Sequence, residues 1–471
     1  MTKKIGLQKN SFYSQIGKLV IPIVLQNLLS AAVNSADVVM LNFVGQSNIS
    51  AVSLAANYTS ILFMVFYGLG TGATMLCAQY YGKGDQRAID VVEGIALRFS
   101  MIVAVLFAAA SLTIPELMMR VFTHDPELVT IGASYLRILS VAYLCWGLTE
   151  VYLSVLRSIG RVAVSTALNT FAFTLNIILN AVFIFGLFGA PKMEAAGVAL
   201  ATSISRVLEL VLCFIVSAKS TNVKLKLSYM LLRSKELLSD FMKMAMPAMA
   251  NDVVWGLGFS MYSVIIGQFL GNDAVAANSL AVVVRNFGTI LCFGMANAGG
   301  ILLGQKFGDN KMEEAEADAK KIVRLTVIAG LIGGVIVLLS MPIVLGFADL
   351  TATGKHYLKV MLLINSYYVL GAALNTTLIA GVFRAGGDSR FGFWCDLIDM
   401  WVYAVPLGFI AAALLKLPPL WVYFLLCTDE FVKWPFVIHH YRSKKWLKNI
   451  TRDNLFQDQE TEKLPASEEK P

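Results

Sequence analysis

The sequence contains few charged residues and few histidines for its length. Of its 471 residues, 15% are Asp, Glu, Lys or Arg, whereas about a quarter of the residues of a soluble protein are charged. It has 4 histidines and shows no Ser-His-Asp arrangement, no zinc-binding spacing and no nucleotide-binding fingerprint. These absences exclude a water-soluble enzyme, and the sequence gives no support for enzymatic activity or for a resident cofactor.

The sequence also lacks any pairing pattern among its six cysteines. They occur singly within apolar stretches, with no Cys-X-X-Cys pair and no histidine at ligand spacing. We therefore expect small interior residues rather than disulfides or metal ligands.

Long apolar runs are what the sequence has in abundance. Hydrophobic residues make up 57% of the chain. At about 22 residues per crossing, this supply suffices for twelve membrane spans and leaves little for a soluble domain. The polar breaks delimit twelve segments, at about 16–44, 50–79, 91–112, 128–156, 163–187, 195–218, 244–270, 274–304, 322–346, 357–382, 391–415 and 419–441. The predicted fold is therefore an all-α integral membrane protein with twelve transmembrane helices.

The basic residues indicate an orientation in the membrane. The net charge of +7 comes from short Lys and Arg clusters in alternate connections between the spans. Because cytoplasmic loops of membrane proteins are enriched in Lys and Arg, both termini are predicted to be cytoplasmic, in agreement with an even number of spans. This explanation leaves no reason to expect nucleic acid as a partner. No removable signal peptide is predicted, and a multi-pass protein of the plasma membrane is expected.

The two halves of the chain are related by an internal repeat. When the two halves are aligned with an offset of 226 residues, Gly68, Gln79 and Gly82 align with Gly294, Gln305 and Gly308. After a one-residue insertion in the second half, the turn at 157–160 aligns with the turn at 384–387. Six spans precede the end of each copy, so both copies have the same orientation and are expected to form two pseudo-symmetric six-helix lobes. The predicted parts are an N-terminus (1–15), a first lobe (16–218), a cytoplasmic connector (219–243), a second lobe (244–441) and a partly disordered tail (442–471).

A candidate ion-coupling site lies in the first lobe. Asp37 is predicted to lie about 12 Å from the outer end of the first span, with Asn34 one turn earlier. Asn180 of the fifth span is predicted at a matching depth, with Asn176 one turn below it. A carboxylate among amides, shielded from water, can bind a proton or supply oxygens to Na⁺. The alternative is a hydrogen-bond clamp that only holds the lobe together.

A candidate substrate cavity involves the second lobe. Asn251 and Asp252 follow Pro247 in the seventh span and either line a cavity or form a satisfied polar pair at a kinked helix. Aromatic rings on the same broad face could stack on a cationic solute or simply pack between helices. The repeat relates this region to the start of the first span, and the candidates are Asp252, Asn251, Trp255, Tyr262, Gln26 and Asn27.

The other charged residues within the spans are expected to have structural roles. Arg206 and Glu209, three residues apart, should pair. Asp396 and Asp399 are expected to reach the membrane interface from near the start of the eleventh span. Glu150, one or two turns before Arg157, could instead face the inner mouth of the cleft. The remaining members of this group, expected to pair or to reach the interface from the inner part of the last span, are Asp429, Glu430 and Lys433.

Together these features resemble the multidrug and toxic compound extrusion (MATE) family of secondary transporters. The resemblance covers residues 12–452. It rests on Pro22, on Asn34-Ser35-Ala36-Asp37, on the repeated sequences at 79–82 and 305–308, and on the paired turns at 156–160 and 383–388. It implies a V-shaped pair of six-helix lobes that exports organic cations or other amphipathic toxic compounds in exchange for H⁺ or Na⁺.

The resemblance also implies roles for single residues. Asp37 matches the first-span carboxylate that the family uses in coupling, and Asn176 matches an asparagine that accompanies it. Asn180 stands where one branch of the family has Asp and other branches have Asn, so the choice between H⁺ and Na⁺ stays open. Asp252 stands where similar members often have Glu, which implies a second coupling site or a site that neutralises the substrate.

The expected function is therefore a monomeric secondary antiporter that works by alternating access and exports small, cationic, amphipathic compounds. A flippase for lipids or lipid-linked precursors, built on a related fold, is the alternative, and it would favour a basic cleft able to hold phosphate. A channel or a structural membrane scaffold is a third possibility, which the doubled architecture disfavours because it suits two-state rocking better than a fixed pore.

Overall fold

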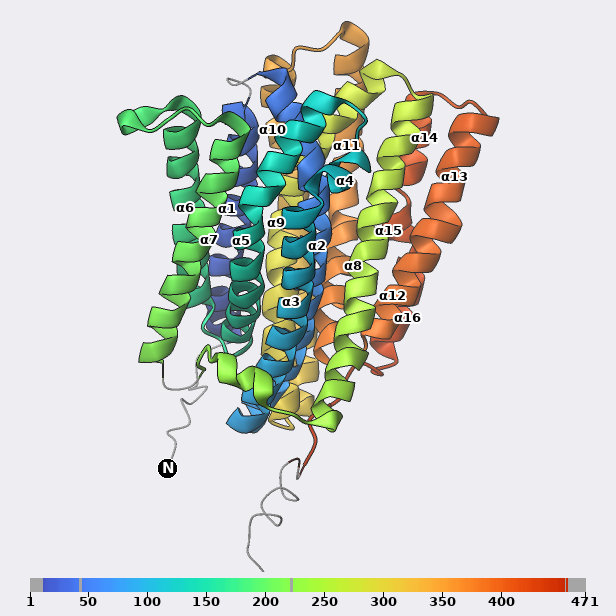
Figure 1. The fold of residues 1–471 in the computed structure, drawn as a ribbon. Helices are drawn as coiled ribbons and strands as arrows, with labels where there is room; N and C mark the ends of the chain where they lie inside the picture. The colour runs from blue at the N-terminus through green and yellow to red at the C-terminus, as the bar shows by residue number, and fades with distance from the viewer. Residues whose placement is uncertain (1–11, 42–44, 221–222, 454, 456–471) are drawn as a thin grey trace, which may run out of the picture.

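The computed structural model describes residues 12–41, 45–220, 223–453 and 455, without the side chains of residues 34–39 and 41. Within these residues the chain is helical and contains no strand. Long helices lie side by side in one bundle (Figure 1). We call the end of the bundle at which α1 begins and α16 finishes the proximal end, and the opposite end the distal end.

Six long helices make up the first half of the chain, and the short helices α4 (Pro115–Arg120) and η1 (Leu187–Gly189) lie in its connections. The long helices are α1 (Phe12–Leu41), α2 (Gln46–Lys83), α3 (Gln86–Thr113), α5 (Pro126–Ser158), α6 (Val162–Phe185) and α7 (Glu194–Lys219). A connector containing η2 (Leu227–Leu231) leads to the second half.

The second half repeats this arrangement with more irregular helices. Its first four spans are α8 (Lys235–Phe269), α9 (Asn272–Gly308), α10 (Met312–Phe347) and α11 (Ala352–Thr376), the last continuing through the π-helical η3 (Thr377–Phe383). The next span is formed by α12 (Ser389–Ile398), η4 (Asp399–Ala404), α13 (Val405–Phe409) and η5 (Ile410–Leu414). The last is formed by α14 (Pro419–Leu426), α15 (Asp429–Val432) and α16 (Trp434–Arg442).

Eleven helical segments within the described ranges are long and apolar enough to cross a membrane. The twelfth predicted segment, 419–441, is present but is divided among three short helices. The division falls where the sequence places polar residues: Asp429 accepts a hydrogen bond from the backbone N–H of Glu430 at 2.8 Å. Because a side chain satisfies a backbone donor there, the helix can turn without leaving that group unpaired.

Helix starts follow from local capping. Asp85 accepts a hydrogen bond from the backbone N–H of Ala88 at 3.0 Å, so α3 begins directly after the turn at Gly84. Ser234 caps α8 in the same way through the N–H of Leu237. These caps place polar turns at the proximal end and leave the apolar faces for packing within the bundle.

The repeat predicted from the sequence is visible where α2 crosses α9. A Cβ atom at Gly82 would overlap the backbone carbonyl oxygen of Gln305, and one at Gly308 would overlap that of Gln79. Glycine is therefore required at both positions, because only a residue without a side chain lets the two backbones approach so closely. Equivalent residues of the two halves thus make reciprocal contacts.

Hydrogen bonds between the halves close the proximal end in the same reciprocal way. Gln79 Nε2 donates to the carbonyl oxygen of Ala385 at 2.7 Å, and Gln305 Nε2 donates to that of Ser158 at 2.8 Å. The acceptors are the two turns that the repeat equates. The segment after α16 runs along this end as well, since the backbone N–H of Ile450 donates to Gln79 Oε1 at 2.8 Å.

Candidate functional site

A cavity of about 680 Å³ lies between the two halves. The first half lines it with residues from α1, α2, α5, α6 and α7, and the second half lines it with residues from α9 and from the chain around η3. Polar groups such as Asn27, Asn169 and Asn297 alternate on its wall with rings such as Phe63 and Tyr67. A mixed wall of this kind suits an amphipathic molecule.

The predicted coupling residues fall on one side of this cavity. Asn176 lines it, donates to Thr202 Oγ1 at 3.1 Å and accepts a hydrogen bond from Asn180 at 3.2 Å. Asn180 is fully buried behind it. The side chains of Asn34 and Asp37 lie outside the described residues. The amide part of the predicted cluster is therefore present on α6 next to the cavity.

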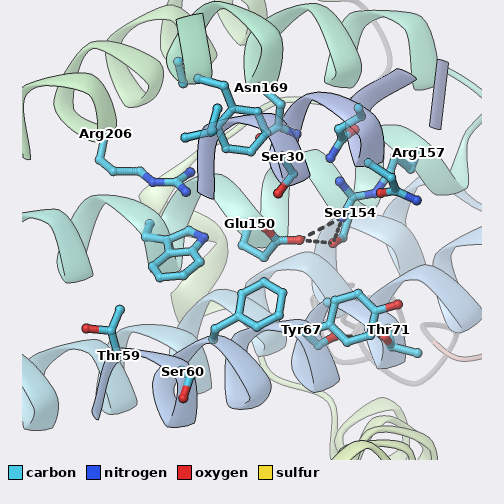
Figure 2. Close-up of a pocket in the computed structure, with 18 of the residues that line it drawn as sticks. Ser30, Thr59, Ser60, Tyr67, Thr71, Glu150, Ser154, Arg157, Asn169 and Arg206 are labelled. Carbon is cyan, nitrogen blue, oxygen red and sulfur yellow. Dashed lines mark hydrogen bonds and ion pairs between the residues drawn. The ribbon is translucent and has the colours of Figure 1, made fainter. Parts of the chain in front are cut away.

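A second feature of the wall is a charged group on α5. Glu150 and Arg157 form an ion pair at 2.8 Å, and Ser154 Oγ accepts from the same Arg157 nitrogen at 2.7 Å. Figure 2 shows Glu150 in the middle of the cavity wall, with Ser154 and Arg157 beside it. Glu150 was expected either to face the inner mouth of the cleft or to have a structural role, and the structure shows that it lines the cavity.

Arg206 of α7 lies on the other side of Glu150 from Arg157 in the same view (Figure 2). Its guanidinium carbon is 4.7 Å from the centre of the Trp146 ring and 5.9 Å from that of Phe173. The predicted pairing with Glu209 is confirmed at 2.8 Å. The two partners are not equally buried: the side chain of Glu209 is 0% exposed and that of Arg206 is 16% exposed. Only Arg206 is part of the cavity wall.

A smaller cavity of about 280 Å³ adjoins the first and is lined mainly by the second half. Asn251, Asp252 and Trp255 all line it. Arg384 Nη2 lies 2.7 Å from both Asn251 Oδ1 and Asp252 Oδ1, while Asp252 Oδ2 is buried and has no hydrogen-bond partner among the described residues. Arg384 also lines the larger cavity, so it stands at the boundary between the two.

A cluster of carboxylates surrounds Lys433 next to the smaller cavity. Lys433 Nζ lies 3.1 Å from Asp396, 3.4 Å from Asp399 and 3.4 Å from Glu430. All four side chains are at least nine-tenths buried. The prediction that Asp396 and Asp399 reach the membrane interface is therefore wrong. They lie too far along the span, Asp396 being about 10 Å from the start of α12, and they turn toward the last span.

The remaining two predicted residues occupy different positions. Tyr262 is buried in the core of the second half and donates a hydrogen bond to Asp429 at 2.9 Å, and it is not among the residues that line either cavity. Gln26 lines the larger cavity from α1, next to Asn27. The six predicted substrate-cavity residues are thus divided between the two cavities and the packed interior.

Four basic residues at these cavities were not predicted as site residues: Arg157, Arg384, Lys433 and Arg206, the last expected only to pair with Glu209. The first two belong to the repeated turns, which had been read only as marks of the repeat. Lys433 was expected to pair or to reach the interface from the inner part of the last span, and the structure shows that it pairs. The available signal was their depth, because a base within a span needs a buried partner or an aqueous cavity.

Comparison with known proteins agrees with this architecture. A family model described as MatE matches residues 22–182 and 247–410, one match in each half. The uncharacterized transporter YisQ of Bacillus subtilis is 24% identical over 436 residues, which cover 91% of this chain and 93% of the relative. The multidrug resistance protein NorM of Vibrio cholerae is 25% identical over 409 residues, which cover 84% and 87%.

Solved structures give the same result for the fold. A structure described as an outward-facing conformation of a multidrug resistance MATE family transporter superposes with a TM-score of 0.83 at 20% identity, covering 93% of this chain and 97% of the other. A MATE crystal structure in the straight conformation gives 0.84 at 20% identity, covering 92% and 96%.

Proposed function

Because the chain belongs to the multidrug and toxic compound extrusion family, we propose that it is an ion-driven antiporter that exports amphipathic compounds, organic cations among them, in exchange for H⁺ or Na⁺. The observation that carries the proposal is the cavity of about 680 Å³ between the repeated halves. A binding site placed between two rigid repeats can be opened to either side of a membrane by rocking one repeat against the other. The flippase alternative is not favoured by the comparisons, whose named relatives include multidrug resistance proteins.

The arrangement of contacts supports this cycle. Hydrogen bonds between the halves gather at the proximal end, through Gln79 and Gln305. We assign that end to the cytoplasm, since the basic connections lie there, and place the protein in the plasma membrane as a monomer. In this assignment the cavity is closed toward the cytoplasm. An inward-facing state must break both reciprocal contacts.

Coupling is assigned to Asp37 with the amides of Asn34, Asn176 and Asn180. A proton or Na⁺ at the carboxylate removes its charge and so weakens its hold on a cationic cargo. Competition between ion and cargo for one charge is sufficient for antiport. Asp252 is assigned a second role in coupling or in neutralising the substrate, because one of its oxygens is buried beside the smaller cavity and has no hydrogen-bond partner within the described part of the chain.

The proposal is tested by efflux of an ethidium-type cation from reconstituted vesicles, with the pH gradient and the Na⁺ gradient imposed separately. We expect one of the two gradients to drive efflux. Asp37→Asn should abolish driven efflux while the protein still inserts, and Asp349→Asn, at an exposed residue after α10, should leave it unchanged. Efflux that needs neither gradient, or full activity of Asp37→Asn, would refute the assigned mechanism.

A further inference from the structure

After the last span, the chain crosses the proximal end of the bundle from one half to the other. We call residues 443–453, which follow α16 directly, the C-terminal segment. None of these residues lines either cavity. The segment is nevertheless held by a series of specific contacts, and these contacts fall into two groups.

The first part of the C-terminal segment is anchored to the second half. Trp446 is 1% exposed, its ring stacks on Tyr441 with the ring centroids 5.5 Å apart, and its Nε1 donates to the carbonyl oxygen of Tyr441 at 2.9 Å. A Cβ atom at Gly386 would overlap the carbonyl oxygen of Trp446, so the segment lies directly on the repeated turn of the second half. Lys444 Nζ lies 2.8 Å from Glu316 of α10. This part is therefore expected to move with the second half.

The last part of the C-terminal segment is attached to α2 of the first half. Lys83 Nζ donates to the carbonyl oxygen of Arg452 at 2.5 Å and lies 2.5 Å from the carboxylate of Asp453. The backbone N–H of Arg452 donates to the hydroxyl group of Tyr80 at 3.3 Å. These contacts extend the attachment of the segment to α2 that was described with the fold.

An ion pair at the start of α8 completes the attachment. Arg452 binds Asp240 through two parallel hydrogen bonds, from Nε at 2.5 Å and from Nη2 at 2.8 Å, the bidentate geometry that makes such pairs strong. The neighbours Leu237 and Phe241 are buried in a core that consists mainly of residues from α2, α3 and α5. The start of α8 therefore packs with the first half, and the pair of Arg452 with Asp240 joins the segment to that half.

The two attachments differ in burial. The anchor contains the enclosed ring of Trp446, whereas the side chains of Arg452 and Lys83 are 43% and 26% exposed and that of Asp453 is 88% exposed. Exposed ion pairs are weak and are screened by salt. The last part can therefore leave the first half and return to it while the anchor stays in place.

From these observations we infer that the C-terminal segment is a latch that holds the two halves together at the proximal end. It is anchored on the second half, and its last residues bind the first half. An inward-facing state separates the halves at this end, so residues 450–453 must release α2 and α8 before the cavity opens there. The latch therefore sets how often this end opens. The inference rests on the alternating access of the proposed function, to which it adds a regulatory device.

The distance between the halves at the proximal end tests the inference without ion gradient or cargo. Spin labels on Ala218→Cys near the end of α7 and Ala317→Cys in α10, both at exposed positions, report this distance by double electron–electron resonance in nanodiscs. Cys395→Ser is included because the other five native cysteines are buried. We expect the wild-type protein to give mainly the short distances of the closed proximal end.

The latch variant combines Lys83→Gln, Asp240→Asn and Arg452→Gln, which removes the charged contacts and leaves no buried carboxylate unpaired. It should raise the population of long distances about threefold or more. The control is Lys444→Gln in the same segment, whose contact lies within the second half and whose partner Glu316 keeps its pair with Lys320. It should leave the distances unchanged.

A salt titration tests the same point without any substitution in the latch. Raising KCl from about 0.05 M to about 0.5 M should shift the wild-type protein toward long distances, because the Debye length falls severalfold, and should have little further effect on the latch variant. Wild-type distances that do not depend on salt would overturn the inference. So would a folded latch variant with wild-type distances, or an equal shift in Lys444→Gln.

Failure of the proposed function is a separate result. A shift in distances that depends on the latch, in a protein whose vesicles show no ion-driven efflux, would refute antiport and leave the latch intact. Ion-driven efflux together with unchanged distances in the latch variant would overturn the latch and leave antiport intact.

Discussion

The two halves of the molecule share a scaffold but differ in how they hold charge inside the bundle. The spacing that relates Arg157 to Arg384 also relates Arg206 to Lys433. In the first half, Arg206 pairs with one carboxylate and lines the cavity. In the second half, Lys433 is 3% exposed and lies within 3.4 Å of three carboxylates.

This difference shows that the repeat constrains backbone contacts more strongly than polar side chains. The reciprocal approach of Gly82 and Gly308 keeps both halves alike where their backbones touch. The charged residues farther along the spans face different neighbours and have diverged. Among the described side chains, the first half therefore presents an excess of basic groups to the larger cavity, while the second half places an excess of carboxylates beside the smaller one.

The largest effect is expected at the base of the second-half cluster. Lys433→Met leaves its carboxylates facing one another without a cation, and breaking a buried ion pair in this way costs about 3–5 kcal/mol. Thermal unfolding in detergent, followed by size-exclusion chromatography, should show a large loss of folded protein. Lys320→Met, at an exposed pair with Glu316, is the control. A melting temperature equal to that of the control would contradict the central role of Lys433.

A smaller effect, on cargo binding rather than on folding, is expected at Asp252. Asp252→Asn removes a carboxylate from the wall of the smaller cavity, so an ethidium-type cation should bind about tenfold more weakly than to the wild-type protein. An uncharged amphiphile of similar size should lose less, because it has no charge for the carboxylate to attract. Binding titrations of the two compounds to the purified protein in nanodiscs measure both affinities. Equal losses for the cation and the uncharged compound would contradict a charge-based role of Asp252.

Each reciprocal glutamine should loosen the turn that it holds, and Gln79 should have the larger effect because it also bonds Lys448 and Ile450. Gln79→Ala and Gln305→Ala each remove a buried hydrogen bond between the halves, worth about 1 kcal/mol. Each should raise hydrogen exchange of the turn that loses its partner, near Ala385 and near Ser158 respectively. Faster exchange at one turn only would show that the closure is asymmetric.

The smallest effect is expected on the surface of the first half. The pair of Arg137 with Glu116 is about half exposed, and exposed ion pairs contribute about 0–1 kcal/mol. Arg137→Gln should therefore leave both the melting temperature and dye binding close to those of the wild-type protein. A melting temperature well below that of the wild-type protein would show that this exposed pair contributes more than its exposure allows.

Most of the fold could be predicted from the sequence. Apolar runs separated by polar turns indicate where the spans lie, and the internal repeat makes Gln79 and Gln305 equivalent, which agrees with their reciprocal contacts. The exception is the last span, where hydropathy averages over residues 419–441 and hides the break at Asp429. A break of this kind depends on a side chain that satisfies the backbone locally, which an average does not register.

Less of the site could be predicted. Amides and carboxylates in the spans were singled out because they are costly in a membrane, and the structure places Asn176, Asn251 and Asp252 along the cavities. Arg384 and Lys433 were missed because their pairing across helices is a tertiary property, whereas Arg157 pairs with Glu150 within its own helix. Lys433 meets Asp396 from another span, and no spacing within either span reveals that contact.

The most direct test is the affinity of the cationic dye for the protein in nanodiscs, measured while pH and Na⁺ are varied one at a time. If ion and cargo compete for Asp37, one of the two ions should weaken dye binding about tenfold or more in the wild-type protein and have little effect in Asp37→Asn. Dye affinity that is independent of both ions, or a wild-type response retained in Asp37→Asn, would contradict coupling through the cavity between the halves.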